Sequence, residues 1–133
     1  MTAYGATLRG RRAAEALMLD TCRIRAVTGD TTDPDTGVVT PAYGDPVYTG
    51  KCKIQAQKSV FPSTPDAGEH QWTVVPMELH LPVDGTEAVG TGLVAEITAS
   101  VDPVNVGRIF RIRSGDRKTL QTALRCQVEE ITG

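Results

Sequence analysis

Residues 21–57, TCRIRAVTGDTTDPDTGVVTPAYGDPVYTGKCKIQAQ, hold two strand-like segments, 21–27 and 47–57, separated by a long polar loop. Apolar residues alternate with polar ones in both segments. A period of two is typical of strands with one buried face, because successive side chains point to opposite sides. The residues expected on the inner face are Cys22, Ile24, Ala26, Tyr48, Cys52, Ile54 and Ala56. We therefore predict that these two strands belong to the core of a β domain.

The remainder of the chain continues the strand pattern after one predicted helix. Apolar Ala13, Ala14, Leu17 and Met18 suggest an amphipathic helix over 6–19, which Gly10 weakens. Alternation predicts further strands at 71–83, 93–100, 107–113 and 120–131. Together these elements predict one mainly β domain over 1–133, with the helix at 6–19 and a barrel over 21–132. The expected fold is a small antiparallel β-barrel or sandwich of six or more strands, with one N-terminal α-helix and two long loops.

Composition narrows the class of protein. The 133 residues carry a net charge of −2, whereas dedicated nucleic-acid binders are usually strongly basic. No apolar run approaches the roughly 18 residues that span a bilayer, and the N-terminus lacks the apolar segment of a signal peptide. We therefore expect no membrane association, and a location in the cytoplasm or in a particle assembled there.

The cysteines are three in number and widely spaced, at Cys22, Cys52 and Cys126. Each lies on the apolar face of a predicted strand, which favours buried, reduced thiols. A bridge between Cys22 and Cys52 is geometrically possible, but a reducing compartment disfavours it.

Catalytic and metal-binding patterns are lacking in the sequence. Glu78 and His80 share one strand face and could both bind a metal, but no third ligand is indicated, so we expect both on the surface. The acidic loop 28–46 does not match the ligand spacing of a calcium loop. We therefore expect a protein that is not an enzyme and that needs no cofactor.

Two long loops, 28–46 and 58–69, are unusual in a compact domain and tend to be functional. In the first, Val38 and Val39 allow a short strand that folds the loop back as a hairpin arm. In the second, Val60 and Phe61 either return to the core or contact a partner. Contact is favoured, because prolines nearby hinder strand pairing.

Seven features follow one another along nearly the whole chain: RRAAEALMLD, TCRIRAVTG, DPDTGVVTP, VYTGKCKIQ, MELHLPV, the turn at Asp102-Pro103, and GRIFRIRSGDRKTLQTALRCQVEEI. In this layout the chain resembles head–tail connector proteins from siphoviruses of actinobacteria, in particular the head-closure or stopper type. The resemblance lies in the order of elements, the turns and the strand texture, and includes no catalytic motif.

The resemblance implies a virion protein whose copies form a ring of six or twelve. The ring would join the portal and its adaptor, on the head side, to the tail terminator or tail tube. DNA would pass through its channel without sequence-specific binding, and a projecting loop would help to retain the packaged DNA. Two alternatives remain open: a tail-terminator or minor tail protein, and a cellular β-barrel that binds a small ligand.

Candidate contact residues follow from the order of the loops along the chain. The candidate channel loop contains Lys58, Ser59, Val60, Phe61, Pro62 and Glu69. The candidate contact with a neighbouring subunit or the adaptor contains Asp30, Asp33, Asp35, Val38, Val39 and Tyr43, together with Arg9 and Arg12 of the helix. The roles of the two loops could be exchanged.

Overall fold

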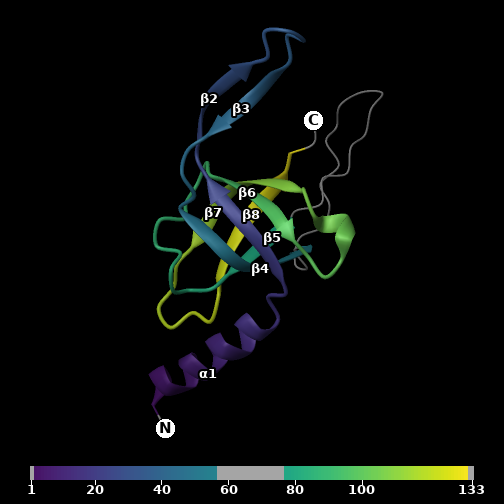
Figure 1. Cartoon of the computed structure of the whole chain (residues 1–133). Helices are drawn as coiled ribbons and strands as arrows, with labels where there is room; N and C mark the ends of the chain where they lie inside the picture. The colour runs from purple at the N-terminus through teal and green to yellow at the C-terminus, as the bar shows by residue number, and fades with distance from the viewer. Residues whose placement is uncertain (1, 57–76, 132–133) are drawn as a thin grey trace, which may run out of the picture.

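The computed structural model describes residues 2–56 and 77–131, which form a barrel with an arm at one end and a helix at the other (Figure 1). The six barrel strands are, in order around the barrel, β1 (Asp20–Arg25), β4 (Tyr48–Ala56), β5 (Met77–Leu81), β8 (Leu124–Glu130), β7 (Ile109–Asp116) and β6 (Val94–Ala99). All neighbours pair antiparallel, and β6 closes the barrel by pairing with β1. The predicted mainly β fold is confirmed, in its barrel form.

Side chains fill the interior of this barrel, as expected for so few strands. The largest of them is Phe110, which is 0% exposed. The buried cluster comprises Cys22, Ile24, Cys52, Leu79, Leu81, Val89, Ala95, Ile97, Phe110, Ile112, Leu124, Cys126 and Val128. The alternation therefore predicted the inner face correctly over the middle of β1 and β4. It was wrong for Ala56 at the end of β4, which is exposed, because the strand there is leaving the barrel.

The arm is a separate two-stranded sheet built from β2 (Val27–Thr32) and β3 (Val39–Tyr43). One residue, Ala26, separates β1 from β2, so the arm continues the path of a barrel strand. The prediction of a long loop over 28–46 is therefore wrong for most of its length, and the strand suggested by Val38 and Val39 is real. Both faces of the arm are in contact with solvent, so its sequence is polar and does not show the alternation by which a strand is recognised.

The helix, α1 (Ala3–Ala16), starts three residues before the predicted 6–19 and ends three residues before it. Its N-cap is Thr2, whose Oγ1 accepts a hydrogen bond from the Gly5 N–H at 3.0 Å. The short 3-10 helix η1 (Pro103–Asn105) follows the predicted turn at Asp102. No helix in the described residues has the length and apolar character needed to cross a membrane.

The face of α1 that meets the barrel differs from the predicted apolar stripe. Met18, just beyond the helix, is buried as expected, but Leu17 is 62% exposed and Ala13 is exposed as well. A Cβ atom on Gly10 would lie 2.7 Å from Cγ2 of Thr122, in the loop between β7 and β8. The helix therefore approaches the barrel through the backbone at Gly10, a contact that a count of apolar residues does not reveal.

Candidate interaction surfaces

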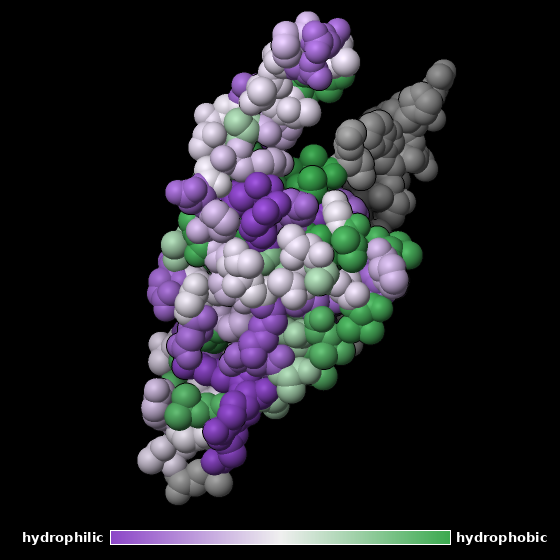
Figure 2. Space-filling model, viewed as in Figure 1, coloured by the Kyte–Doolittle hydropathy of each residue, from purple (hydrophilic) through white to green (hydrophobic). Residues whose placement is uncertain are grey.

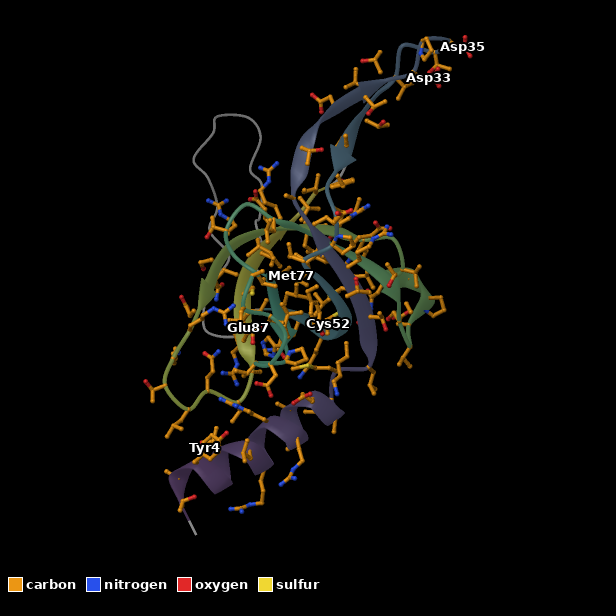
Figure 3. The ribbon with its side chains drawn as sticks, turned by 60° about the vertical axis from the view of Figure 1, so that its left-hand side comes forward. Tyr4, Asp33, Asp35, Cys52, Met77 and Glu87 are labelled. Atoms are coloured by element: carbon orange, nitrogen blue, oxygen red, sulfur yellow. The ribbon has the colours of Figure 1, made fainter. Side chains whose placement is uncertain are left out.

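The arm exposes nearly all of its surface. All six residues of β2 are exposed, Asp30 among them, and Val38 and Val39 are 56% and 59% exposed. Asp33 and Asp35 lie at its tip (Figure 3). A hairpin without a core is marginally stable in water, so the arm depends on its turn and on its attachment to the barrel.

The turn at the tip is organised by Asp33. Its Oδ1 accepts hydrogen bonds from the backbone N–H groups of Asp35, at 2.8 Å, and Thr36, at 3.4 Å. These bonds lower the pKa of Asp33, because they stabilise its carboxylate form. Gly37 closes the turn with φ of +73°, a conformation that favours glycine. Asp33 therefore has a local structural role in addition to its charge.

The base of the arm is attached through Tyr43, whose ring centroid lies 4.0 Å from the guanidinium carbon of Arg25. The Oε2 atom of Glu96 accepts hydrogen bonds from Arg25, at 3.1 Å, and from Arg23, at 3.0 Å. The N–H of Gly44 donates to the carbonyl of Ala26 at 2.9 Å. Tyr43 thus faces its own barrel, and its first role is to hold the arm.

A largely apolar groove of about 430 Å³ lies where the arm meets the barrel. It is lined by Val27, Asp30, Pro41, Tyr43, Val94, Ile109, Arg111 and Ile131. Residues from β2, β3, β6 and β7 meet there, so the groove forms where the base of the arm adjoins the first residues of β6 and β7. Sequence reasoning did not find it, since it depends on pairing between distant segments.

The helix carries the two basic residues of the predicted contact set. Arg9 and Arg12 are exposed on α1, whereas the Nε of Arg11 donates to the carbonyl of Gln121 at 3.0 Å. Glu15 forms an ion pair with Lys51 of β4 at 3.1 Å. The helix and the arm lie at opposite ends of the barrel, as Tyr4 and Asp33 illustrate in Figure 3. The structure therefore divides the predicted contact set into two surfaces, with Arg9 and Arg12 on one and the arm residues on the other.

An apolar flank beside η1 is a surface that the sequence did not single out. Leu17, Leu19, Val101, Val104 and Val106 are all exposed, and Val104 is 79% exposed. Leu17, Leu19 and Val101 line a hollow of about 410 Å³. Figure 2 shows hydrophobic surface on the side of the molecule where Figure 1 places η1. Three valines around the Asp102-Pro103 turn were the available signal, because turns are usually polar.

The pair Glu78 and His80 differs from its prediction. Nε2 of His80 lies 2.9 Å from Oε2 of Glu78, and His80 is only 9% exposed, so its expected surface position is wrong. Neighbouring strands place Lys53 and Arg125 directly opposite His80, and such long side chains cover an outer barrel face. Within 2–56 and 77–131, no group of three or more histidine, cysteine or acidic residues is arranged to hold a metal ion.

The three cysteines are fully buried and unbridged. A hydrogen bond with the Cys52 thiol, followed by burial, raises the pKa of Cys22. Burial raises the pKa of Cys126 to about 11. Thiols with raised pKa values and no exposure are poor nucleophiles, because the thiolate is the reactive form. The expectation of buried thiols is confirmed.

The candidate channel loop, with Lys58, Ser59, Val60, Phe61, Pro62 and Glu69, lies outside the described residues. Its assignment stays a prediction.

Comparison with known proteins identifies the family. Residues 10–129 match the model described as "Family of unknown function (DUF6093)". A search of curated proteins found no significant match. The match extends from the middle of α1 through most of β8, so the chain belongs to this family.

Proposed function

We propose that this family member is a structural subunit of a phage head–tail connector, of the head-closure or stopper type. Its copies form a ring that joins the portal–adaptor complex to the tail and helps to retain packaged DNA. The proposal combines the layout resemblance of the sequence with one structural observation, the projecting arm.

The arm is the main support for the proposal, because its exposed residues can contact another protein and add little to the buried core. All six residues of β2 are exposed, and two valines near the tip of the arm are more than half exposed to water. A sheet of two strands has free hydrogen-bonding edges, which readily accept a strand or a loop from another chain. An element with these properties is best explained as a means of holding a neighbouring protein.

The barrel supports a scaffold role. Its interior is occupied by the side chains of the buried cluster, from Phe110 to the three cysteines. A barrel that binds a small ligand keeps an internal cavity, whereas the large interior side chains of this barrel, such as Phe110, Leu79 and Leu124, are fully buried and pack together in one cluster. This observation disfavours the ligand-binding alternative.

The position of the two surfaces also supports assembly as a ring. The acidic arm and the basic helix lie at opposite ends of the barrel (Figure 1). A subunit of a cyclic ring must present two different surfaces to its two neighbours. The arm and α1 meet that requirement with opposite charge.

Electron microscopy of purified virions tests this proposal, with the protein marked by a fused tag. We expect the label at the junction of head and tail, directly below the adaptor. A label beside the tail tube would favour the tail-terminator or minor-tail alternative. Virions without the protein would contradict both viral functions.

A variant with residues 28–43 replaced by a short glycine–serine linker supplies the functional readout. We expect normal amounts of folded barrel, and heads that neither join tails nor retain their packaged DNA. A matched control replaces Thr31 and Thr40 of the arm by serine, which keeps the hairpin. Full infectivity of the arm-deleted virus would contradict the proposal.

A further inference from the structure

We propose that the arm of one copy docks along the solvent face of α1 of a neighbouring copy. This inference rests on the proposed function, because it names the contact that would connect subunits in the ring. It assigns a role to the only two elements of the described residues that extend away from the barrel.

Charge complementarity is the first support. The arm, 27–43, contains Asp30, Asp33 and Asp35 and no lysine or arginine. Helix α1 contains Arg9, Arg11 and Arg12 against a single acidic residue, Glu15, which is already paired with Lys51. Opposite charges on two surfaces guide association and fix its register, and like charges in the same place oppose it. The charges of the arm therefore favour α1 over a second arm.

The apolar content of the two surfaces also matches. Residues 9, 12, 13 and 16 lie on one side of a 3.6-residue helix, opposite the side that contains the buried Thr7. That side combines Arg9 and Arg12 with the methyl groups of Ala13 and Ala16, all exposed. The arm combines its aspartates with Val38 and Val39. The small side chains of Ala13 and Ala16 let the backbone of the arm approach α1 closely. Val38 and Val39 can then pack against these alanines, between the pairs formed by aspartates of the arm and arginines of the helix.

The lengths agree as well. Six residues of β2 extend about 20 Å, at about 3.3 Å per residue. Fourteen residues of α1 extend about 21 Å, at 1.5 Å per residue. An arm laid along the helix therefore covers it from end to end.

The geometry requires two molecules. The arm and α1 of one chain lie on opposite sides of a barrel (Figure 1), so the arm cannot reach its own helix. The contact then uses two different surfaces per subunit, which generates a head-to-tail series. Such a series closes into a ring when the rotation between subunits divides a full turn.

Charge reversal tests the contact with the full chain. Asp30→Lys with Asp35→Lys reverses the arm and leaves the turn residue Asp33 intact. Arg9→Glu with Arg12→Glu reverses the helix. We expect each pair to weaken self-association in sedimentation velocity by about tenfold or more, and the four substitutions together in one chain to restore it.

Two controls accompany this experiment. Asp45→Lys with Asp84→Lys changes the net charge as the arm variant does, at exposed sites outside the arm, and should leave self-association unchanged. Raising the salt concentration should weaken the wild type and the fourfold variant alike, because salt screens exposed charges.

Disulfide cross-linking gives an independent readout, since the native thiols are buried. Val38→Cys and Ala13→Cys, mixed as separate chains, should form a mixed dimer, and the two changes in one chain should give a ladder. Val38→Cys mixed with Asp84→Cys is the matched control. Cross-linking of Val38→Cys to Ala13→Cys no greater than this control overturns the inference.

The outcomes separate this inference from the proposed function. Rings that form normally with either charge-reversed pair overturn the arm–helix contact and leave the connector function standing. Restoration by the fourfold variant supports the contact, even if the label in virions lies away from the junction. Failure of the fourfold variant to restore association that both pairs abolish also overturns the contact.

Discussion

The barrel and the arm contain similar local structure and differ in what holds them. In the barrel, paired strands enclose a cluster of side chains that are almost completely removed from water. In the arm, paired strands enclose nothing, and the six residues of β2 are all exposed. The barrel and the arm therefore both have hydrogen-bonded strand pairs, but only the barrel buries side chains between its strands. Substitutions should accordingly change global stability in the barrel and association or local opening in the arm.

The strongest test of this contrast is Phe110→Ala. Phe110 is the largest fully buried side chain, and its truncation leaves a cavity among the strands. We expect the free energy of unfolding to fall by about 3–5 kcal/mol in denaturant titration. The same loss should make the three buried thiols accessible to a thiol reagent at lower denaturant concentration.

The matched change in the arm is Val39→Ala, which also removes apolar atoms from a strand. Because Val39 is already 59% exposed, we expect a change within about 0.5 kcal/mol. A loss from Val39→Ala approaching that from Phe110→Ala would show that the arm folds as part of the core, and the contrast would fail.

An effect smaller than that of Phe110→Ala is expected at Gly10, where α1 meets the barrel. Alanine improves helix propensity by about 1 kcal/mol, but its Cβ would lie 2.7 Å from Cγ2 of Thr122. Such overpacking costs about 1–3 kcal/mol, so Gly10→Ala should destabilise by about 1 kcal/mol in a thermal melt. Adding Thr122→Ser removes the obstructing methyl group and should raise stability above that of the single variant. Equal stability of the single and double variants would show that the helix docks elsewhere.

How far the sequence could predict this fold follows from the same contrast. Alternation identified Cys22, Ile24 and Cys52 as inward, because burial on one strand face leaves a period of two. The sequence of the arm shows no period of two, because both faces of the arm are in contact with solvent. Residues 28–46 were therefore predicted to be a loop. The helix contact was missed because it depends on the absence of a side chain at Gly10.

The sequence selected the candidate contact residues, but it did not predict that they would lie on two separate surfaces. Arg9 and Asp33 were placed in the same predicted contact set, because the order of elements along the chain does not show at which end of the barrel each element lies. The exposed valines near η1 were missed, since solvent exposure of an apolar residue in a turn is a property of the folded surface. The basic charge of α1 and the length of the segment 28–46 nonetheless pointed to residues at both ends of the molecule.

A still smaller effect is expected at Tyr43, which joins the two regions. A partly exposed cation–π contact contributes about 0.5–1 kcal/mol, so Tyr43→Ala should weaken the attachment of the arm without destabilising the barrel. Hydrogen exchange of the Gly44 amide, which donates to Ala26, should accelerate about two- to five-fold. Tyr43→Phe retains the ring over Arg25 and should exchange as the wild type does. Acceleration spreading to the amides of β6 would indicate that arm and barrel open together.

The smallest effect concerns the turn of the arm and depends on pH. Hydrogen bonds lower the pKa of Asp33 in the folded arm, so its stabilising contribution is fully present above the ordinary value of 3.8. That contribution is lost as the pH falls through the lowered pKa, because the protonated carboxyl is a weaker acceptor. In a titration followed by NMR, the amide of Asp35, a donor to Asp33, should shift below about pH 4.

Asp33→Asn distinguishes this local event from general acid unfolding. The asparagine side-chain oxygen can accept the same backbone hydrogen bonds but carries no titrating group, so the part of the acid shift of the Asp35 amide that comes from Asp33 should disappear. The amide of Ile97, which donates to the carbonyl of Arg108 at the barrel wall, should stay unchanged over the same range in both proteins. If Ile97 shifted together with Asp35, the turn and the barrel would respond as one unit, because an isolated hairpin turn cannot transmit its protonation to a closed core.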